Sequence, residues 1–244
     1  MSKIELYKGE SSEVMKPITS KEATTFLIDK HYSGRKPQIK YAFGLFQDEN
    51  LKAVVTYGVP ASRSLCVGIM GEEYYDKVIE LNRLCRLDDY TKQLSKFVAY
   101  SLRELKKYNL LIVSYSDLAM NHHGSIYQAC NFLFTGTTKE RTDKYTPNGK
   151  HSRHYTDDFN NLRKVRSAKH RYIYFATDKR HKKIFMKNLK YEIIRNFPKG
   201  DKKEYKLGEF IKPLIYNKDT KEYYFEDVYK KPIEDNIAEK GDIW

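Results

Sequence analysis

Apolar positions along this chain recur in short runs that are separated by polar turns. The first run follows a candidate N-cap at Thr19 or Ser20, and its apolar side chains stand at positions 23, 26, 27 and 28. This spacing places them on one face of a helix, so it predicts a short amphipathic helix that ends near His31.

The remaining runs predict an alternation of strands and helices. Residues 47–50 have hairpin-turn composition between two strand-like runs. Residues from Pro213 onward are mildly acidic and predict an irregular tail. The predicted strands are 41–46, 51–57, 78–84, 110–113, 133–138 and 172–176, and the predicted further helices are 93–107, 126–132 and 182–189. This order predicts an α/β fold with a mixed central sheet and helices on both faces.

The length and the charge distribution narrow this picture. A chain of 244 residues suits one domain with an elaboration. Lys and Arg exceed Asp and Glu by 45 to 32, and residues 163–212 alone hold 17 basic and 5 acidic residues. Such a concentration predicts attraction to a polyanion, and nucleic acid is favoured over a membrane because no amphipathic or lipidated anchor accompanies it. A solvated basic face is the alternative.

The cysteines and the apolar runs indicate the cellular compartment in which the protein is expected. Cys66, Cys85 and Cys130 are widely spaced and include no C-x-x-C pair, so neither a disulfide framework nor a zinc knuckle is expected. The sequence has no signal-peptide core and no apolar run of 18 residues. We therefore expect a soluble protein in a reducing cytoplasm, with no membrane partner.

Residues 114–131 form a dense polar block between a predicted buried strand and a predicted helix. Ser, Asp, Asn, His and Tyr side chains follow the apolar run 110–113, and Gly124 with Ser125 precedes the helix. This predicts a pocket at the carboxyl end of the strand. The alternative is that Asp117, Asn121 and Ser125 only cap a helix.

Candidate roles follow from residue type and position. Asp117 is the candidate general base or orienting carboxylate, or else a turn residue. Arg83 can hold a phosphate or carbonyl group, or else form a surface ion pair. Ser95 opens the helix 93–107, where free amides attract phosphate, or else only caps it.

Two further residues are assigned to catalysis with an open alternative for each. His31 can titrate near neutral pH or contact DNA, or else be stabilised by the helix dipole. Tyr57 can stack on a flipped adenine or on the cofactor, or else pack within the sheet.

Four histidines, at positions 122, 123, 151 and 154, raise the question of a metal site. No pair has both ligand spacing and a matching third ligand, so no metal is expected. His151 and Arg153 are instead assigned to the phosphate backbone. The full set of residues assigned to DNA contact is Arg141, His151, Arg153, Lys169, Arg171, Lys182 and Lys183.

Several motifs, in order, resemble the Mom family of phage DNA-modification proteins, which are related to N-acetyltransferases. The motifs are HYSG at His31, FGLF and VVTYGVPAS within 43–62, ELNRLCR from Glu80, SYSD through HHGSIYQACNF, GKHSRH from Gly149, and then KHRYIYF, DKRHKK and PKGD, which end at Asp201. The resemblance covers roughly residues 20–200 and implies an N-acetyltransferase-like (GNAT-like) fold. It also implies conversion of adenine in double-stranded DNA to an N6-carbamoylmethyl derivative in the cytoplasm of a bacterial host, as a defence against restriction, with acetyl-CoA as donor.

The resemblance also implies site residues and a domain organisation. Tyr127 matches a tyrosine that protonates the departing thiolate in related acetyltransferases, or else it packs in the core. Arg83, Ser95 and Tyr127 are the residues expected to bind acetyl-CoA. We expect a catalytic domain at 1–155, a DNA-contacting basic extension at 156–212 and a tail at 213–244. A homodimer is left open.

One departure from the acetyltransferase pattern keeps other functions open. The turn 86–90 lacks a glycine-rich pyrophosphate loop. The alternatives are therefore an acetyltransferase acting on another amine and a non-catalytic DNA-binding protein.

Overall fold

The computed structural model describes residues 7–9, 13–31, 33, 36–90, 94–147, 155–200 and 212–226. The chain folds into two compact units: unit 1 comprises Met1–Lys139 with Ser167–Phe210, and unit 2 comprises Glu140–Arg166 with Ile211–Trp244. The expected boundaries at residues 155 and 212 do not coincide with this division. The segment 156–212 contributes one strand to each unit, because strand pairing and not charge decides where a segment packs.

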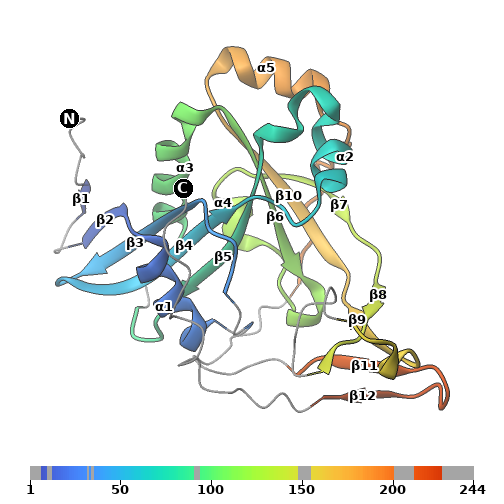
Figure 1. Ribbon diagram of the computed structural model, residues 1–244. Coiled ribbons are helices and arrows are strands. Elements are labelled where there is room, and N and C mark those ends of the chain that lie inside the picture. The colour runs from blue at the N-terminus through green and yellow to red at the C-terminus, as the bar shows by residue number, and fades with distance from the viewer. Residues whose placement is uncertain are drawn as a thin grey trace. The chain divides into compact units, whose positions relative to one another are not determined.

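Unit 1 is built on a mixed sheet with helices on both faces, which confirms the predicted fold class (Figure 1). Its eight described strands follow the order β1-β2-β3-β4-β5-β6-β10-β7, and every neighbouring pair is antiparallel except β5 with β6. The strands are β1 (Tyr7–Gly9), β2 (Glu13–Pro17), β3 (Tyr41–Gln47), β4 (Asn50–Gly58), β5 (Val78–Arg86), β6 (Leu110–Asp117), β7 (Leu133–Thr137) and β10 (Lys169–Ala176). The helices are α1 (Ser20–Lys30), α2 (Arg63–Tyr74), α3 (Ser95–Leu105), α4 (Ser125–Ala129) and α5 (Lys179–Asn188), with short 3-10 turns at Tyr75–Lys77, Lys106–Tyr108 and Leu118–Met120.

The local signals in the sequence are confirmed. Thr19 and Glu22 form a capping box at the start of α1, and His31 ends that helix. Asp48 and Glu49 adopt left-handed backbone angles, with φ of 49° and 63°, which joins β3 to β4 through a tight turn.

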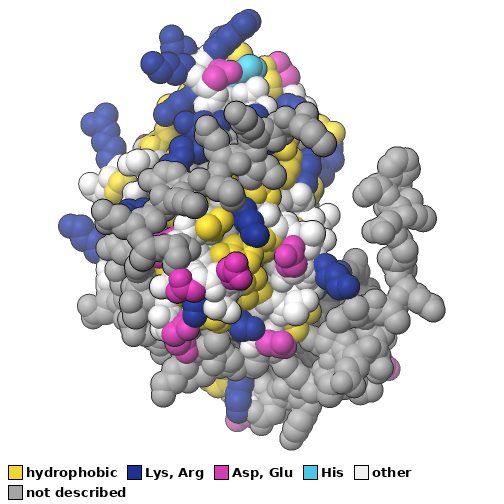
Figure 2. Space-filling view, turned by 90° about the vertical axis from the view of Figure 1, so that its left-hand side faces the viewer, with side chains coloured by type: hydrophobic (Ala, Val, Ile, Leu, Met, Phe, Trp, Pro, Cys, Tyr) yellow, Lys and Arg dark blue, Asp and Glu magenta, His cyan; other side chains and the backbone are white. Residues whose placement is uncertain are grey.

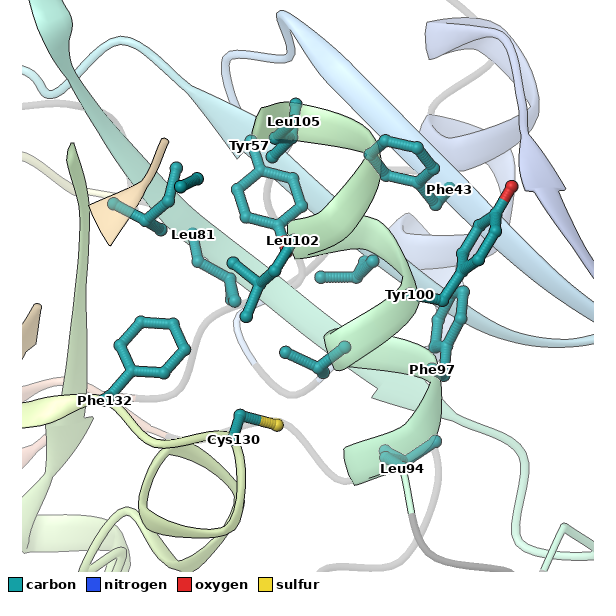
Figure 3. Close-up of a cluster of buried hydrophobic side chains, with 14 of the residues drawn as sticks. Phe43, Tyr57, Leu81, Leu94, Phe97, Tyr100, Leu102, Leu105, Cys130 and Phe132 are labelled. Atoms are coloured by element: carbon teal, nitrogen blue, oxygen red, sulfur yellow. The ribbon is translucent and has the colours of Figure 1, made fainter. Parts of the chain in front are cut away.

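One face of the sheet packs against α3. The apolar positions 94, 97, 98, 102 and 105 of the predicted helix are all buried. Figure 3 shows Leu102 and Leu105 beside Tyr57 of β4 and Leu81 of β5. The helical spacing of these side chains places them on one stripe, which explains why α3 covers this face.

The other face packs against α1, α2 and α5. Phe26 and Leu27 of α1 contact Ala42 and Val54. Ile69 and Met70 of α2 and Phe185 of α5 pack on a group of sheet residues, Val78, Leu111, Val113, Ile173 and Phe175. The pattern analysis missed α2, because its apolar positions are weakly segregated and it contains Gly68 and Gly71.

Unit 2 is a small antiparallel sheet in the order β12-β11-β9-β8. Its strands are β8 (Arg141–Lys144), β9 (Leu162–Arg166), β11 (Leu214–Asn217) and β12 (Tyr223–Phe225), and a 3-10 turn spans Asp157–Phe159. The prediction of an irregular tail after Pro213 is wrong for residues 214–225. These residues form a hairpin whose first strand pairs with β9, which lies far away in the sequence and leaves no local signal.

Across the described residues, no helix is long and apolar enough to cross a membrane.

Candidate active site

The two parallel strands of unit 1 diverge at their carboxyl ends. β5 pairs with β6 only from Val78↔Leu111 to Glu80↔Val113. Beyond that point β5 continues along β4, while β6 continues along β10. Where they part, the buried Ser114 hydroxyl donates a hydrogen bond of 2.9 Å to the Leu81 carbonyl. The divergence leaves backbone groups and side chains of both strands facing a gap in the ladder, which is where a ligand can bind an α/β sheet.

Asp117 ends β6 and is held by three donors. The Lys169 ammonium lies 2.8 Å from its Oδ2, the Ala119 amide donates to its Oδ1 at 3.0 Å, and the Ser167 hydroxyl also donates to Oδ1. Burial by itself raises the pKa of the Asp117 carboxyl, but Lys169, Ser167 and the amide together bring this pKa below its usual value. A carboxylate with a lowered pKa is a weak base. Of the two catalytic roles left open by the sequence, the orienting carboxylate fits this geometry better than the general base, and Asp117 also has the turn-capping role.

Glu80 is a second carboxylate on the same face of the sheet. Glu80 is paired with Val113 of β6. Because side chains alternate along a strand, Val113 and Asp117 lie on the same face of the sheet, and Glu80 shares that face. Burial raises the pKa of Glu80, although the charges of Arg83 and Lys169 act in the opposite direction. Glu80 and Asp117 both interact with Lys169, and their pKa values are shifted in opposite directions, which suits two different roles, one in proton transfer and one as a fixed anion.

Glu80 was not among the site residues predicted from the sequence. The available signal was a charged residue within the apolar run of the strand 78–84.

Arg83 lies close enough to both Glu80 and His31 for its charge to act on their pKa values. Arg83 is half-buried on β5, and its Nη1 donates to the Asn82 carbonyl at 2.7 Å. His31 is buried at the end of α1, where its Nδ1 accepts a hydrogen bond of 3.1 Å from the Ser33 amide. Burial, with the charges of Arg83 and His122, lowers the pKa of His31 to about 3. The structure thus brings together His31 and Arg83, and His31 is neutral at physiological pH.

The turn between β6 and α4 is held in place by a side-chain cap and by hydrogen bonds to the His123 carbonyl. Asp117 caps the 3-10 turn Leu118–Met120, and Gly124 precedes α4 with a φ of 75°. The Tyr172 hydroxyl and the Gln128 amide donate to the His123 carbonyl at 2.5 and 3.0 Å. These bonds fix the turn against β10.

Two buried polar atoms at this end of the sheet have no hydrogen-bond partner among the described residues. They are Ser116 Oγ on β6 and His123 Nδ1 in the turn. His170 is paired with Ser116 in the ladder. Its ring centroid lies 6.0 Å from that of His123 in a tilted arrangement, and its Nδ1 lies 2.8 Å from Thr137 Oγ1. Burial lowers the pKa of His170, and the neighbouring His123 adds to this effect. Buried unpaired polar atoms are costly, so they suit a site that a polar ligand completes.

The three other residues assigned to catalysis or acetyl-CoA are placed as follows. Tyr57 is completely buried, and its hydroxyl lies 2.6 Å from Ser101 Oγ. This favours the in-sheet role that the sequence left open. Tyr127 lies on α4, and its ring packs at 5.3 Å from that of Tyr172. Ser95 is the first residue of α3, as expected, and its carbonyl accepts a hydrogen bond from the Cys130 thiol of the segment after α4.

The residues assigned to DNA contact are either exposed, paired with other residues of unit 1, or outside the described residues. Lys182 and Lys183 are exposed on α5, at the top of the views in Figures 1 and 2, where Lys and Arg side chains stand out. Arg141 is exposed on β8 of unit 2. Lys169 is instead paired with Asp117, and Arg171 donates to the Thr135 carbonyl at 2.6 Å and stacks 3.3 Å from the Tyr191 ring centroid. His151 and Arg153 lie outside the described residues.

Neither of the two cavities found in unit 1 is lined by a candidate catalytic or cofactor residue. One, of about 600 Å³, lies between α1 and β4, and the other, of about 300 Å³, lies beside the start of α5 and includes Lys182. The described residues contain no group of three His, Cys, Asp or Glu side chains placed to hold a metal ion.

Unit 1 is therefore a mixed α/β protein in which polar side chains gather where the single parallel strand pair diverges. The model of the Mom protein family matches residues 13–198, and the chain belongs to this family.

Several solved structures are similar to the chain. The ribosomal-protein-S18-alanine N-acetyltransferase from Escherichia coli is 12% identical, with a TM-score of 0.43 over 68% of this chain and 95% of that one. The IAA acetyltransferase from Bacillus cereus is 13% identical, with a TM-score of 0.44 over 67% and 99%. An acetyltransferase from Bacillus subtilis in complex with CoA is 12% identical, with a TM-score of 0.35 over 55% and 76%. No curated protein matches the chain.

Proposed function

We propose that this protein is a transferase that modifies adenine in double-stranded DNA, forming an N6-carbamoylmethyl derivative that protects phage DNA from restriction. Membership of the Mom family over residues 13–198 supports the reaction class. The observation that carries the proposal is the divergence of β5 and β6, with Glu80, Arg83, Asp117 and Lys169 gathered at that point.

Acetyl-CoA is the cofactor that we propose for this protein. Ser116 Oγ, which lies on the face of β6 opposite to Asp117, and His123 Nδ1 have no partner among the described residues and can form hydrogen bonds to a polar ligand at the end of β6. Arg83, Ser95 and Tyr127 are the residues that we expect to bind acetyl-CoA, and the bound thioester would supply an activated two-carbon unit. The turn that would meet the pyrophosphate includes residues 91–93, which lie outside the described residues.

The protein's own residues have distinct tasks in this proposal. The adenine amine is a weak nucleophile because its lone pair is delocalised, and it is stacked inside the duplex, so the base must be flipped out. Glu80, with its raised pKa, is suited to accept a proton from the amine. Asp117, fixed by Lys169, orients the groups around it. The exposed cations of α5 bind phosphates and set the register on the duplex.

Acyl transfer alone does not give the proposed product. Direct acetyl transfer to N6 would attach a carbonyl carbon, whereas the carbamoylmethyl group attaches a methylene and carries a terminal amide. The amide nitrogen and the formation of the methylene bond therefore require chemistry beyond a simple acetyltransferase step.

Mass spectrometry of nucleosides from the DNA of expressing cells tests the proposal. We expect a modified deoxyadenosine with the wild-type chain and none with Arg83→Ala, at equal amounts of folded protein. Unmodified deoxyadenosine with folded wild-type protein present would overturn it. Acetyl-CoA turnover by the purified protein without DNA would favour an acetyltransferase acting on another amine.

A further inference from the structure

One face of the unit 2 sheet combines exposed aromatic rings with basic side chains. The ladder aligns Lys144, Arg163, Tyr216 and Tyr223 in one row across β8, β9, β11 and β12. Two positions along the same strands lie two further pairs, Thr142 with Val165 and Leu214 with Phe225. Side chains in directly paired positions lie on the same face of a sheet, so the row and the two pairs share a face. We call these eight residues the aromatic-basic face.

The aromatic rings of this face are open to solvent. Tyr223 and Phe225 are 60% and 65% exposed, although large apolar side chains are usually buried. The Tyr216 and Tyr223 rings contact each other in a tilted arrangement, with their centroids 4.8 Å apart and an angle of 38° between their planes. A rigid ring with a free face is a platform on which a planar group can stack.

The charges of the two faces differ. The aromatic-basic face carries Lys144 and Arg163 and includes no acidic residue among its eight members. Lys144 also lies over the Tyr155 ring, with Nζ 4.1 Å from its centroid, which brings a further ring to the basic end of the row. Asp143 and Glu226 belong to the alternate positions, where Asp143 lies 3.5 Å from Arg166 and Glu226 accepts a hydrogen bond from Tyr145. The alternate positions also carry Arg141, Lys164 and Arg166, so the two faces differ in their acidic groups and exposed rings and not in the presence of basic charge.

We propose that the aromatic-basic face binds single-stranded nucleic acid, with unpaired bases stacked on Tyr223 and Phe225 and phosphates held by Lys144 and Arg163. Rings beside cations on a sheet fit this ligand, because every base has a flat face and every linkage a negative charge. A duplex fits less well, since its bases are already stacked. A second copy of the chain would set like charges against each other. The proposal does not rest on the proposed transfer reaction, and residues 214–225 lie outside the family match.

Fluorescence anisotropy of the full chain with a labelled oligothymidylate of about 16 nucleotides tests this proposal. The test variant is Tyr223→Ala with Phe225→Ala. The matched control is Tyr224→Ala, because Tyr224 is 43% exposed but occupies the alternate face of the same strand. We expect the affinity of the double variant for the single strand to fall about tenfold or more, and that of the control to stay within about twofold. Binding of a duplex of equal length should be unchanged in both.

Further measurements separate the proposal from a general charge effect and from loss of folding. Arg163→Gln should lower the slope of log affinity against log salt by about 0.7 for the single strand. Circular dichroism must show that each variant keeps its fold. An equal loss in Tyr224→Ala, an equal loss for duplex, or no loss at all in the double variant would overturn the proposal. A dimer that dissociates in the double variant, seen by light scattering, would assign the face to self-association instead. None of these measurements needs acetyl-CoA or a modified base, so a chain that fails to modify DNA can still pass them.

Discussion

Lys169 Nζ lies 2.8 Å from Asp117 Oδ2, at the position where the first residue of β10 pairs with the last residue of β6. The same lysine also acts on the pKa of Glu80. One cation from a distant strand therefore influences both carboxylates of the candidate site.

Lys169→Met should raise the pKa of Asp117, because burial of the carboxyl remains while its main charge partner is removed. The ionised Asp117 stabilises the wild-type fold above pH about 4, and this contribution is lost as the pH falls through the lowered pKa. We expect the free energy of unfolding at pH 7 to fall by about 1 kcal/mol, and the variant to lose less on acidification. Urea unfolding at pH 7 and pH 3 measures both effects.

Lys52→Met is the control for this experiment. It removes an ion pair with Asp89, whose side chain is 61% exposed, so the effect should be smaller. An equal fall in the free energy of unfolding in both variants would show that the partly buried Lys169–Asp117 pair stabilises the fold no more than an exposed ion pair does.

His31 should make the fold sensitive to mild acid. Its pKa is lowered to about 3 in the folded chain, whereas the unfolded histidine titrates near 6.5. The neutral side chain therefore stabilises the fold fully above pH 6.5, and this contribution falls as the pH drops from there toward 3.

In His31→Gln, the urea midpoint should vary less between pH 7 and pH 5 than in the wild type. Burial also lowers the pKa of His122 and His170, so both remain as a common background in the two proteins. Identical pH profiles would show that His31 is not buried in its neutral form.

Glu80→Gln should abolish most of the proposed activity. If Glu80 accepts the proton, the loss is expected to be about 10²- to 10⁴-fold in modified nucleoside per folded protein. The acidic limb of the wild-type pH profile should lie above the ordinary carboxyl value of 4.5, because burial raises the pKa of Glu80. Full activity in the Gln variant would show that Glu80 does not take part in the reaction. So would a wild-type pH profile whose acidic fall in activity is centred below pH 4.5.

Gly124→Ala should destabilise the turn between β6 and α4. Gly124 has a φ of 75°, and a Cβ there would lie 2.5 Å from Cζ of the buried Tyr172. We expect a loss of about 2 kcal/mol or more in the free energy of unfolding. Gly68→Ala in α2 is the control, since its Cβ would be 3.5 Å from the Tyr191 hydroxyl and a helix favours alanine. Gly68→Ala should be neutral or stabilising in the same thermal melt.

The exposed lysines of α5 should contribute to duplex binding. Replacing Lys182 and Lys183 with Gln should lower the slope of log affinity against log salt by about 0.9 for each phosphate that the variant no longer neutralises. Lys16→Gln with Lys21→Gln removes two exposed cations from the other end of the sheet and should change the slope little. If both double variants behave alike, the basic helix has no specific role.

The elements that sequence analysis located correctly depend on residues a few positions apart. The capping box of Thr19 with Glu22, the turn at Asp48 and Glu49, and the buried stripe of α3 are all local. Backbone hydrogen bonding and helical spacing fix such features wherever the segment later packs.

The candidate site depended on contacts that no local pattern contains. The insertion of β10 between β6 and β7 brings Lys169 to Asp117, and it places Arg171 against Thr135 and Tyr191. The short β5–β6 pairing places Glu80 beside the divergence of the strands.

The sequence by itself therefore determined the α/β class, the local caps and turns, and the residues that carry the family resemblance. Only the tertiary structure decided which of the charged residues meet and in which protonation state. The physical reason is that strand register between distant segments is set by how the two apolar faces of the sheet are buried, and burial in turn sets the pKa values of the carboxylates and histidines.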